Sequence, residues 1–175
     1  LGIKPEITMA ARRVNERQPE EVVAHLDKVT GSLPGFPKEP IIALLGIAFK
    51  GRPPTDDLRG SMAMPTFESL KLRFPLAKFR GYDAVVDADA IEAFGVTACS
   101  SIEEALAGAH LVLILNNHVE FSTMLLETLA PSMGKPGLVY DFWNNFVADE
   151  LTLPKGVGYM ALGSHGRAVL PEWEE

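Results

Sequence analysis

Three basic residues stand close together in a chain that is otherwise acidic. Lys50, Arg52 and Arg59 fall within ten positions, whereas the formal net charge of the chain is -7. Basic side chains hold phosphate groups, lysine as a point charge and arginine through a planar fork. Two aspartates lie between the arginines, so ion pairs on a solvated loop would explain the same residues. The segment is therefore either an anion-binding site or a charged surface loop.

The glycines of this segment match a phosphate-binding loop only in part. Gly46 and Gly51 have the G-x-x-x-x-G spacing, but Arg52 and Pro53 follow where lysine and a serine or threonine are required. Pro53 has no backbone N–H to donate and no hydroxyl for a magnesium ion. The G-x-G-x-x-G fingerprint of dinucleotide sites is absent here as well. Phosphate-loop ATP hydrolysis is excluded at this segment, whereas binding of another anion is not.

Cysteine and histidine offer little further chemistry. Cys99 is the single cysteine, so the chain can form neither an internal disulfide nor a C-x-x-C metal site. No glycine or basic residue flanks it, and we expect a small buried or half-buried residue rather than a nucleophile. The four histidines, at positions 25, 110, 118 and 165, lack metal-ligand spacing. The sequence predicts no metal site and no catalytic residue in this chain.

The composition is that of one globular domain with a substantial core. Of 175 residues, 47% are hydrophobic and 22% are charged. The acidic balance disfavours nucleic acid as a partner. The longest aliphatic run, 111–115, is far shorter than the roughly 20 residues of a membrane span, so no membrane is expected either. A single cysteine and the lack of a secretory leader fit the cytoplasm. Residue one is leucine, and we expect part of a longer or processed polypeptide.

A long helix is predicted at the start of the chain. Apolar residues recur at intervals of three and four over residues 5–29, and Pro5 suits the first helical turn. Pro19 should kink this helix or split it in two. Residues 31–40 are rich in proline and glycine and are predicted to be a linker.

Short apolar strands then alternate with helices. The predicted strands are residues 41–47, 77–82, 96–98, 111–115, 138–142 and 157–162. The predicted helices are residues 61–74, 89–94, 102–107 and 121–129, with Ser61 as an N-cap and Met64, Phe67, Leu70 and Phe74 as an apolar stripe. This alternation predicts an α/β fold, a three-layer, Rossmann-like, doubly wound and mainly parallel sheet preceded by the long helix. Ligands bind beyond the carboxyl ends of such strands, which directs attention to residues 48–60.

Three stretches resemble the signatures of one enzyme family. The first reads L-G-I-A-F-K from Leu45, then T-D-D from Thr55, then Arg59 and Ser61. It closely resembles the L-G-x-A-F-K and T-x-D-x-R-x-S signature of the UDP-glucose/GDP-mannose dehydrogenase family. Residues 82–86, Y-D-A-V-V, are similar to the family's Y-D-P-x-V motif. The A-R-R-V-N stretch of the first helix looks like the long connecting helix through which these enzymes dimerise.

The resemblance implies a division of the chain and a set of partners. Residues 1–30 would be the connecting and dimerisation helix, 31–40 the linker, and 41–175 the Rossmann-like nucleotide-sugar-binding domain. Family members oxidise the C6 alcohol of a UDP-sugar to a carboxylate with two NAD+, through a cysteine thiolate that forms a thiohemiacetal and then a thioester. The implied partners are a UDP-sugar, an N-terminal NAD-binding domain of the same polypeptide, and a second subunit in a homodimer.

The resemblance also implies roles for single residues. Phe49 and Lys50 would lie against the nucleotide sugar, with Lys50 near the pyrophosphate. Arg59 would reach the NAD cofactor of the adjoining domain, and Asp57 would orient Arg59. The family's G-G-x-C-F-P-K-D catalytic segment is not found in this sequence. The chain would therefore be the C-terminal part of the enzyme and inactive alone.

Two positions bear on which sugar would be bound. The H-x-x-F pattern that begins at His118 resembles that of the branch that oxidises UDP-N-acetylhexosamines such as UDP-N-acetylmannosamine. A polar residue at a strand-to-helix turn explains His118 equally. Trp143 stands where the family has a substrate-contacting arginine, and we expect a core or rim aromatic there. The alternatives are a non-enzymatic nucleotide-binding or dimerisation module and a dehydrogenase specific for UDP-glucose or GDP-mannose.

Overall fold

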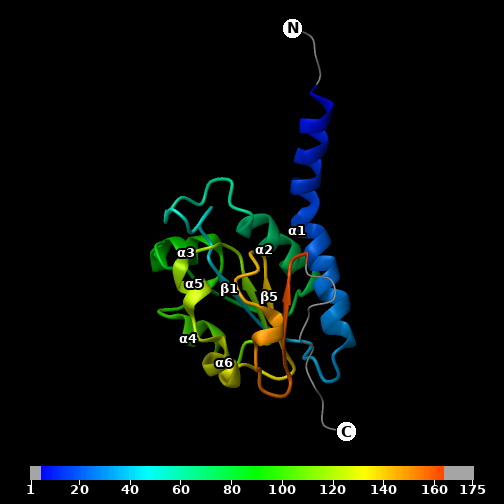
Figure 1. The fold of residues 1–175 in the computed structure, drawn as a ribbon, viewed down its shortest axis with the longest axis vertical. Helices are drawn as coiled ribbons and strands as arrows, with labels where there is room; N and C mark the ends of the chain where they lie inside the picture. The colour runs from blue at the N-terminus through cyan, green and yellow to red at the C-terminus, as the bar shows by residue number, and fades with distance from the viewer. Residues whose placement is uncertain (1–4, 164–175) are drawn as a thin grey trace.

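Six strands form one sheet in which every neighbouring pair is parallel (Figure 1). The computed structural model describes residues 5–163, and the strand order is β3-β2-β1-β4-β5-β6. The strands are β1 Ile41–Leu45, β2 Lys78–Tyr82, β3 Thr97–Ala98, β4 Leu111–Ile114, β5 Gly137–Asp141 and β6 Val157–Ala161. The predicted doubly wound α/β sheet is confirmed.

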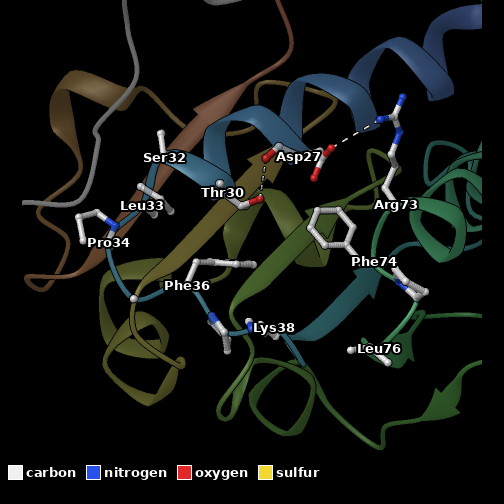
Figure 2. Close-up of a pocket in the computed structure, with 14 residues that line it drawn as sticks. Asp27, Thr30, Ser32, Leu33, Pro34, Phe36, Lys38, Arg73, Phe74 and Leu76 are labelled. Atoms are coloured by element: carbon white, nitrogen blue, oxygen red, sulfur yellow. Dashed lines mark hydrogen bonds and ion pairs between the residues drawn. The ribbon is translucent and has the colours of Figure 1, made fainter.

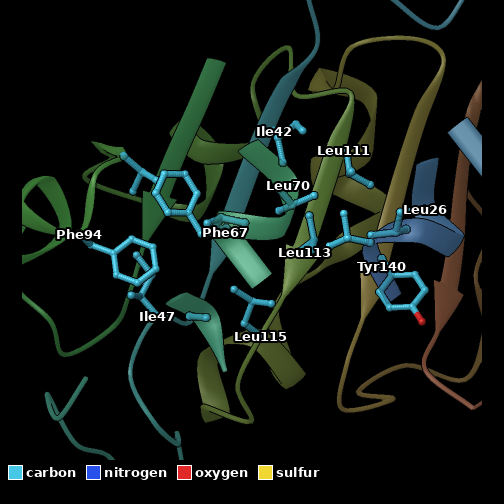
Figure 3. Packing of buried hydrophobic residues seen from close by; sticks show 14 of the residues in the cluster. Leu26, Ile42, Ile47, Phe67, Leu70, Phe94, Leu111, Leu113, Leu115 and Tyr140 are labelled. Carbon is cyan, nitrogen blue, oxygen red and sulfur yellow. The ribbon is translucent and has the colours of Figure 1, made fainter. Parts of the chain in front are cut away.

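Helices cover both faces of the sheet and complete the three layers. They are α1 Glu6–Ser32, α2 Ala63–Arg73, α3 Ala88–Phe94, α4 Ile102–Leu106, α5 Val119–Thr123 and α6 Leu126–Leu129, with 3-10 turns η1 Ala130–Ser132 and η2 Ala148–Glu150. Leu26 of α1, Phe67 of α2 and Phe94 of α3 belong to one buried cluster (Figure 3). Leu106 of α4 and Phe121 of α5 belong to a second cluster. The two clusters lie on opposite faces of the sheet.

The central strands are apolar on both faces because both faces are covered. All four residues of β4 are fully buried, and so are Ile42, Ala43, Leu44 and Leu45 of β1. Strands buried on both sides have continuous hydrophobic runs rather than alternation. The prediction that 41–47 and 111–115 are buried strands is therefore confirmed, with the regular ladders ending a little earlier.

The first helix departs from its prediction in two respects. α1 is a single helix of 27 residues that continues through Pro19, so of the two expected outcomes, a kink or a split, the split is wrong. Pro19 is itself buried, and burial of the neighbouring Val22 and Val23 stabilises the helix across the missing hydrogen bond. The helix also continues past residue 29 to Ser32, where the Thr30 hydroxyl donates to the Leu26 carbonyl at 2.8 Å.

The start of α2 shows why a serine precedes it. Met62 rather than Ser61 occupies the N-cap position, so the predicted boundary is off by about one residue. The Ser61 hydroxyl nevertheless accepts from Ala63 N at 3.1 Å and donates to the Ile47 carbonyl at 2.7 Å. Ser61 thereby ties the segment after β1 to the start of the helix. Met64 is 40% exposed and lies off the predicted apolar stripe.

The single helix predicted at 121–129 is wrong. Two short helices, α5 and α6, occupy residues 119–129 and are followed by η1. Met124 and Leu125 between them are non-helical, and the Ser122 and Thr123 hydroxyls both donate to the Val119 carbonyl. Hydroxyl side chains that bond to the preceding turn compete with the regular helical ladder.

The long helix has two different halves. Its second half buries Val22, Val23 and Leu26 in the core and packs along α2. Its first half extends past the sheet, as Figure 1 shows, and leaves Ile7 and Val14 exposed. Among the described helices, including this one, none combines the length and the hydropathy that crossing a membrane requires.

The two halves make opposite predictions for truncation of an apolar side chain. Leu26→Ala should lower the free energy of unfolding by about 2–5 kcal/mol, because it leaves a cavity in a fully buried site. Ile7→Ala is the matched control on the same helix and should change stability by less than about 0.5 kcal/mol. Urea denaturation followed by circular dichroism measures both. Equal effects would show that the second half of α1 is not part of the core.

Candidate functional site

The order of the strands reverses between β1 and β4, and we call the region beyond the carboxyl ends of these two strands the crevice. The chain leaves β1 toward α2 on one face and leaves β4 toward α5 on the other face. Ligands of open α/β sheets bind in a crevice of this kind. The residues that follow β1, β4 and β5 therefore make up the candidate site.

Two glycines allow the segments after β1 and β4 to touch. A Cβ atom on Gly46, whose φ is +83°, would lie 2.5 Å from the side chain of Asn116. One on Gly51 would lie 1.9 Å from the backbone nitrogen of His118. Gly51 N instead donates to the Asn117 side-chain oxygen at 3.0 Å. The G-x-x-x-x-G spacing in the sequence thus serves close packing of two loops at the crevice.

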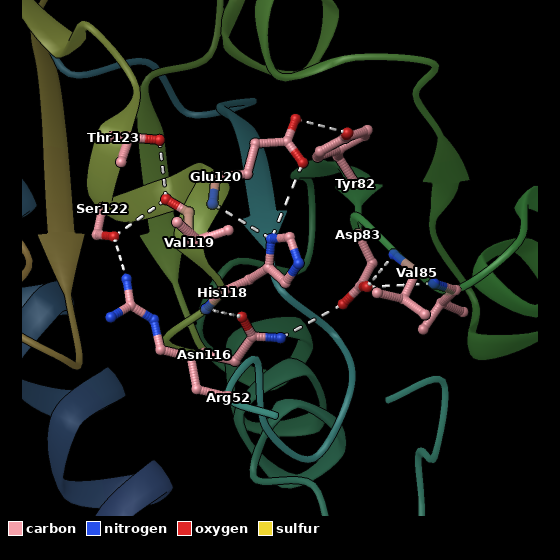
Figure 4. A network of polar contacts seen from close by, with 11 residues as sticks. Arg52, Tyr82, Asp83, Val85, Asn116, His118, Val119, Glu120, Ser122 and Thr123 are labelled. Carbon is pink, nitrogen blue, oxygen red and sulfur yellow. Dashed lines mark hydrogen bonds and ion pairs between the residues drawn. The ribbon is translucent and has the colours of Figure 1, made fainter. Parts of the chain in front are cut away.

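A buried carboxylate from β2 holds the start of the loop after β1 (Figure 4). The Asp83 carboxylate is almost fully buried, and its Oδ2 accepts from Ala48 N at 2.9 Å. Its Oδ1 accepts from Val85 N at 2.9 Å and from Val86 N at 3.2 Å. The Asn116 amide donates to the Ala48 carbonyl, 3.4 Å away. The sequence showed Asp83 only as a motif letter, because its partner lies 35 positions away.

The three basic residues of the loop have different surroundings. Arg59 forms a double hydrogen bond with Asp57, Nε to Oδ1 at 2.9 Å and Nη2 to Oδ2 at 2.8 Å, and these bonds lower the pKa of Asp57 to about 2. Arg52 donates to the Ser122 hydroxyl at 2.7 Å. Within residues 5–163, no acceptor faces the Lys50 ammonium. The charged loop is thus partly self-paired and leaves one cation available.

Phe49 lies next to this cation with its backbone fixed. Phe49 N donates to the Asp57 carbonyl at 2.8 Å, while its side chain is 53% exposed. At the crevice, an exposed aromatic ring is thus followed directly by an ammonium that has no partner among the described residues. The roles expected for Phe49, Lys50 and Arg59 toward substrate and NAD stay predictions.

His118 begins α5 and is part of a polar network (Figure 4). Its Nδ1 accepts from Glu120 N at 3.3 Å, which caps the helix. The Tyr82 hydroxyl donates to the Glu120 carboxylate at 2.8 Å, and burial together with this carboxylate raises the pKa of Tyr82 to about 12. The structure therefore gives His118 a role in the strand-to-helix turn, and contact with a substrate stays a prediction.

Trp143 follows β5 at the same edge of the sheet. Its backbone N donates to Asp141 Oδ1 at 2.8 Å, and its indole N–H donates to the Leu115 carbonyl at 3.0 Å. The side chain is 48% exposed, so Trp143 is a rim aromatic rather than a core residue. The carboxylate that holds it, Asp141, is fully buried, and burial raises its pKa above the usual value.

The remaining candidate residues lie away from this edge or carry no activated group. Cys99 is buried, and burial raises the pKa of its thiol, which disfavours the nucleophilic thiolate. His110 precedes β4 at the opposite edge, where its Nδ1 accepts from Ile41 N at 3.3 Å. His165 lies outside the described residues. Among residues 5–163, no three potential metal ligands gather.

A hollow of about 650 Å³ lies at the amino edge of the sheet (Figure 2). The end of α1, the loop 33–38 and the end of α2 line it. Asp27 and Arg73 form an ion pair across it at 3.6 Å. Because ligands of such folds bind at the carboxyl edge, this hollow is not the candidate site.

Comparison with known proteins identifies the domain at this point. Residues 43–148 match the sequence model described as the UDP-binding domain of the UDP-glucose/GDP-mannose dehydrogenase family. The chain belongs to this family. The matched residues include the loop after β1, Asp83, Asn116 and the turn after β5 that carries Trp143 and Asn145.

The relatives are nucleotide-sugar dehydrogenases. A UDP-N-acetyl-D-mannosamine dehydrogenase of Pyrococcus horikoshii is 33% identical over 70% of this chain and 26% of the relative. The UDP-glucose 6-dehydrogenase YwqF of Bacillus subtilis is 32% identical over 95% of this chain and 36% of the relative. A solved structure of UDP-D-ManNAc dehydrogenase from Pyrococcus horikoshii aligns with a TM-score of 0.65 and 26% identity, over 93% of this chain and 34% of that one. The chain thus spans about a quarter to a third of their length.

The hydrogen bonds that the buried Asp83 carboxylate accepts at the crevice predict a specific loss of stability. Asp83→Ala should lower the free energy of unfolding by at least about 2 kcal/mol, because the buried N–H groups of Ala48 and Val86 and the part-buried N–H of Val85 lose their acceptor. Asp87→Ala is the matched control, since Asp87 accepts from Ala90 N at an exposed helix start. It should cost about 1 kcal/mol. Equal losses of unfolding free energy in the two variants, measured by chemical denaturation, would contradict this role of Asp83.

Proposed function

We propose that this chain is the nucleotide-sugar-binding C-terminal part of an NAD-dependent UDP-sugar 6-dehydrogenase. The observation that carries the proposal is Lys50, which has no partner among residues 5–163 and lies at the crevice of a domain from a UDP-binding family. An ammonium without a protein partner is ready to form a charge-assisted hydrogen bond to a phosphate. The pyrophosphate of UDP supplies that anion.

Phe49 and Lys50 form the substrate-binding pair in this proposal. Lys50 contacts the pyrophosphate, and the exposed ring of Phe49 covers the nucleotide sugar. Arg59, whose side chain is 91% exposed and held by Asp57, reaches the NAD bound to an adjoining domain of the same polypeptide. NAD bound there would supply the hydride acceptor, and the residues of this chain would bind and orient the nucleotide sugar.

The proposed substrate is a UDP-N-acetylhexosamine, whose C6 alcohol is oxidised to the carboxylate. His118 supports this branch by its place at the crevice, directly after the contact between Gly51 and Asn117. The second candidate substrate is UDP-glucose, because one relative carries that name. We assign the reaction to the cytoplasm.

The proposed organisation keeps the division made from the sequence. Residues 1–30 serve as the connecting and dimerisation helix, 31–40 as the linker and 41–175 as the UDP-binding domain. The exposed apolar side chains of the first half of α1 support a subunit contact, and Ile7 is 88% exposed. A closed twofold dimer is the commonest assembly that such a helix could form.

The proposal predicts that these 175 residues alone are inactive. The family's catalytic cysteine segment and a dinucleotide fingerprint are not found in the sequence, so no hydride transfer to NAD+ should follow addition of any UDP-sugar. The growth of NADH absorbance measures this. Turnover by the 175-residue chain would contradict the division of labour proposed here.

A second prediction concerns Lys50 in the complete protein. Lys50→Ala should weaken UDP binding roughly ten- to a hundredfold, because a charged hydrogen bond contributes about 1.5–3 kcal/mol. Lys50→Arg should recover only part of the affinity, because guanidinium differs in shape. Lys78→Ala, at the opposite edge of the sheet, is the matched control and should bind as the parent does.

Calorimetry with UDP and a thermal melt together decide the matter. The melting temperature should barely move, because the half-buried Lys50 side chain forms no ion pair or hydrogen bond with residues 5–163. Parent-like UDP binding by Lys50→Ala would show that the loop is not the phosphate site. Unfolding of this variant would show that Lys50 is a structural residue.

A further inference from the structure

Trp143 is an exposed aromatic side chain whose orientation is nevertheless fixed. Its indole N–H donates to the Leu115 carbonyl at 3.0 Å, and its backbone N donates to Asp141 Oδ1 at 2.8 Å. Nearly half of the side chain remains accessible. Single exposed apolar residues are common on protein surfaces, but Trp143 is held at both its backbone and its ring. The ring therefore presents a fixed apolar surface.

The turn that carries Trp143 is itself anchored in the core. The fully buried Asp141 carboxylate accepts from the Asn145 amide at 2.9 Å and from the Tyr159 hydroxyl at 2.9 Å. Asn144 adopts a left-handed conformation, with φ of +53°, between these anchored residues. A non-glycine residue in this conformation persists where its surroundings determine the backbone. The position of the indole is thus determined by buried contacts.

The indole lies at the end of β4, beside the crevice. Leu115, which accepts the indole hydrogen bond, itself donates its N–H to the Leu45 carbonyl at 2.8 Å. Trp143 therefore reaches from the end of β5 across to the end of β4, the neighbour of β1. Phe49 follows β1 and is 53% exposed. Two exposed aromatic side chains thus follow the strands on either side of β4, and Lys50, without a partner in the described part of the chain, lies next to one of them.

We propose that Trp143 is a stacking platform for one ring of the nucleotide sugar. The proposal rests on the proposed function, because it takes the phosphate site at Lys50 as given. The indole N–H is already satisfied by Leu115, so the contact is made by the ring face. Uracil and the apolar face of a pyranose both stack on such a surface. Because the ring is already immobilised, binding orders little that was free before.

Calorimetry on the complete protein tests the platform with two titrants, UDP and UDP-N-acetylglucosamine. Trp143→Ala should weaken, roughly tenfold, the binding of each titrant that contains the stacked ring. Trp143→Phe keeps an aromatic face and should recover most of the affinity, whereas Trp143→Leu should not. Leu72→Ala removes another exposed apolar side chain, on α2, and is the matched control. A thermal melt of each variant checks folding. If Trp143→Ala does not fold, the comparison of Trp143→Phe with Trp143→Leu tests the platform instead.

The two titrants separate the possible rings. A loss with both ligands assigns the uracil, and a loss with UDP-N-acetylglucosamine alone assigns the hexose; either result supports the platform. Parent-like affinity of both Trp143→Ala and Trp143→Leu, or equal losses in the phenylalanine and leucine variants, would overturn it. Lys50→Ala, measured alongside, distinguishes the failures. If it also binds UDP as the parent does, the proposed phosphate site fails, whereas a loss confined to Lys50→Ala overturns the platform only.

Discussion

The Asp83 carboxylate, buried at the end of β2, determines where the candidate site can form. It accepts from Ala48 N, which follows the neighbouring strand β1, and from the backbone of its own turn. It therefore joins the segments after β1 and β2. Asn116 adds the segment after β4 through its bond to the Ala48 carbonyl. An unsatisfied buried carboxylate would be costly, and here each oxygen accepts from backbone N–H groups. Phe49 and Lys50 follow directly from this anchored point.

A fully parallel sheet requires cover on both faces, and this requirement explains the two halves of α1. β1 and β4 are buried on both sides, so one face needs α1 as well as α2 and α3. The second half of α1 supplies Leu26 to that face. Its first half contributes no buried hydrophobic side chain to the core of the described residues and exposes Ile7 and Val14. The same helix can therefore serve the core at one end and a subunit contact at the other.

The site combines rigid backbone with exposed side chains. Phe49 and Trp143 are each held through a backbone N–H, yet about half of each side chain is accessible. Arg59 is held by Asp57 in a double hydrogen bond. Lys50 is the cation of the loop without a partner among residues 5–163. Such an arrangement is suited to binding and orienting an anionic ligand with little reorganisation.

The sequence by itself determined the sheet, and from the sheet it predicted the position of the site. The apolar runs at 41–47 and 111–115 predicted strands buried on both faces, and their alternation with helices predicted parallel pairing. The loop after β1 was then the expected site from topology alone. Local hydroxyl chemistry, which splits 119–129 into two helices, and burial around Pro19 were not visible in the periodic pattern.

Only the tertiary structure decided which charged and aromatic residues are free to bind. Whether Lys50, Arg52 or Arg59 is paired depends on neighbours that the fold brings together, and Ser122 lies 70 positions from Arg52. Gly51 meets Asn117 over 66 positions, and Trp143 meets Leu115 over 28. Hydrogen bonds of this kind form between strands that are distant in sequence, so local propensity carries no signal for them. The strand order, which places β4 between β1 and β5, brings these partners into contact.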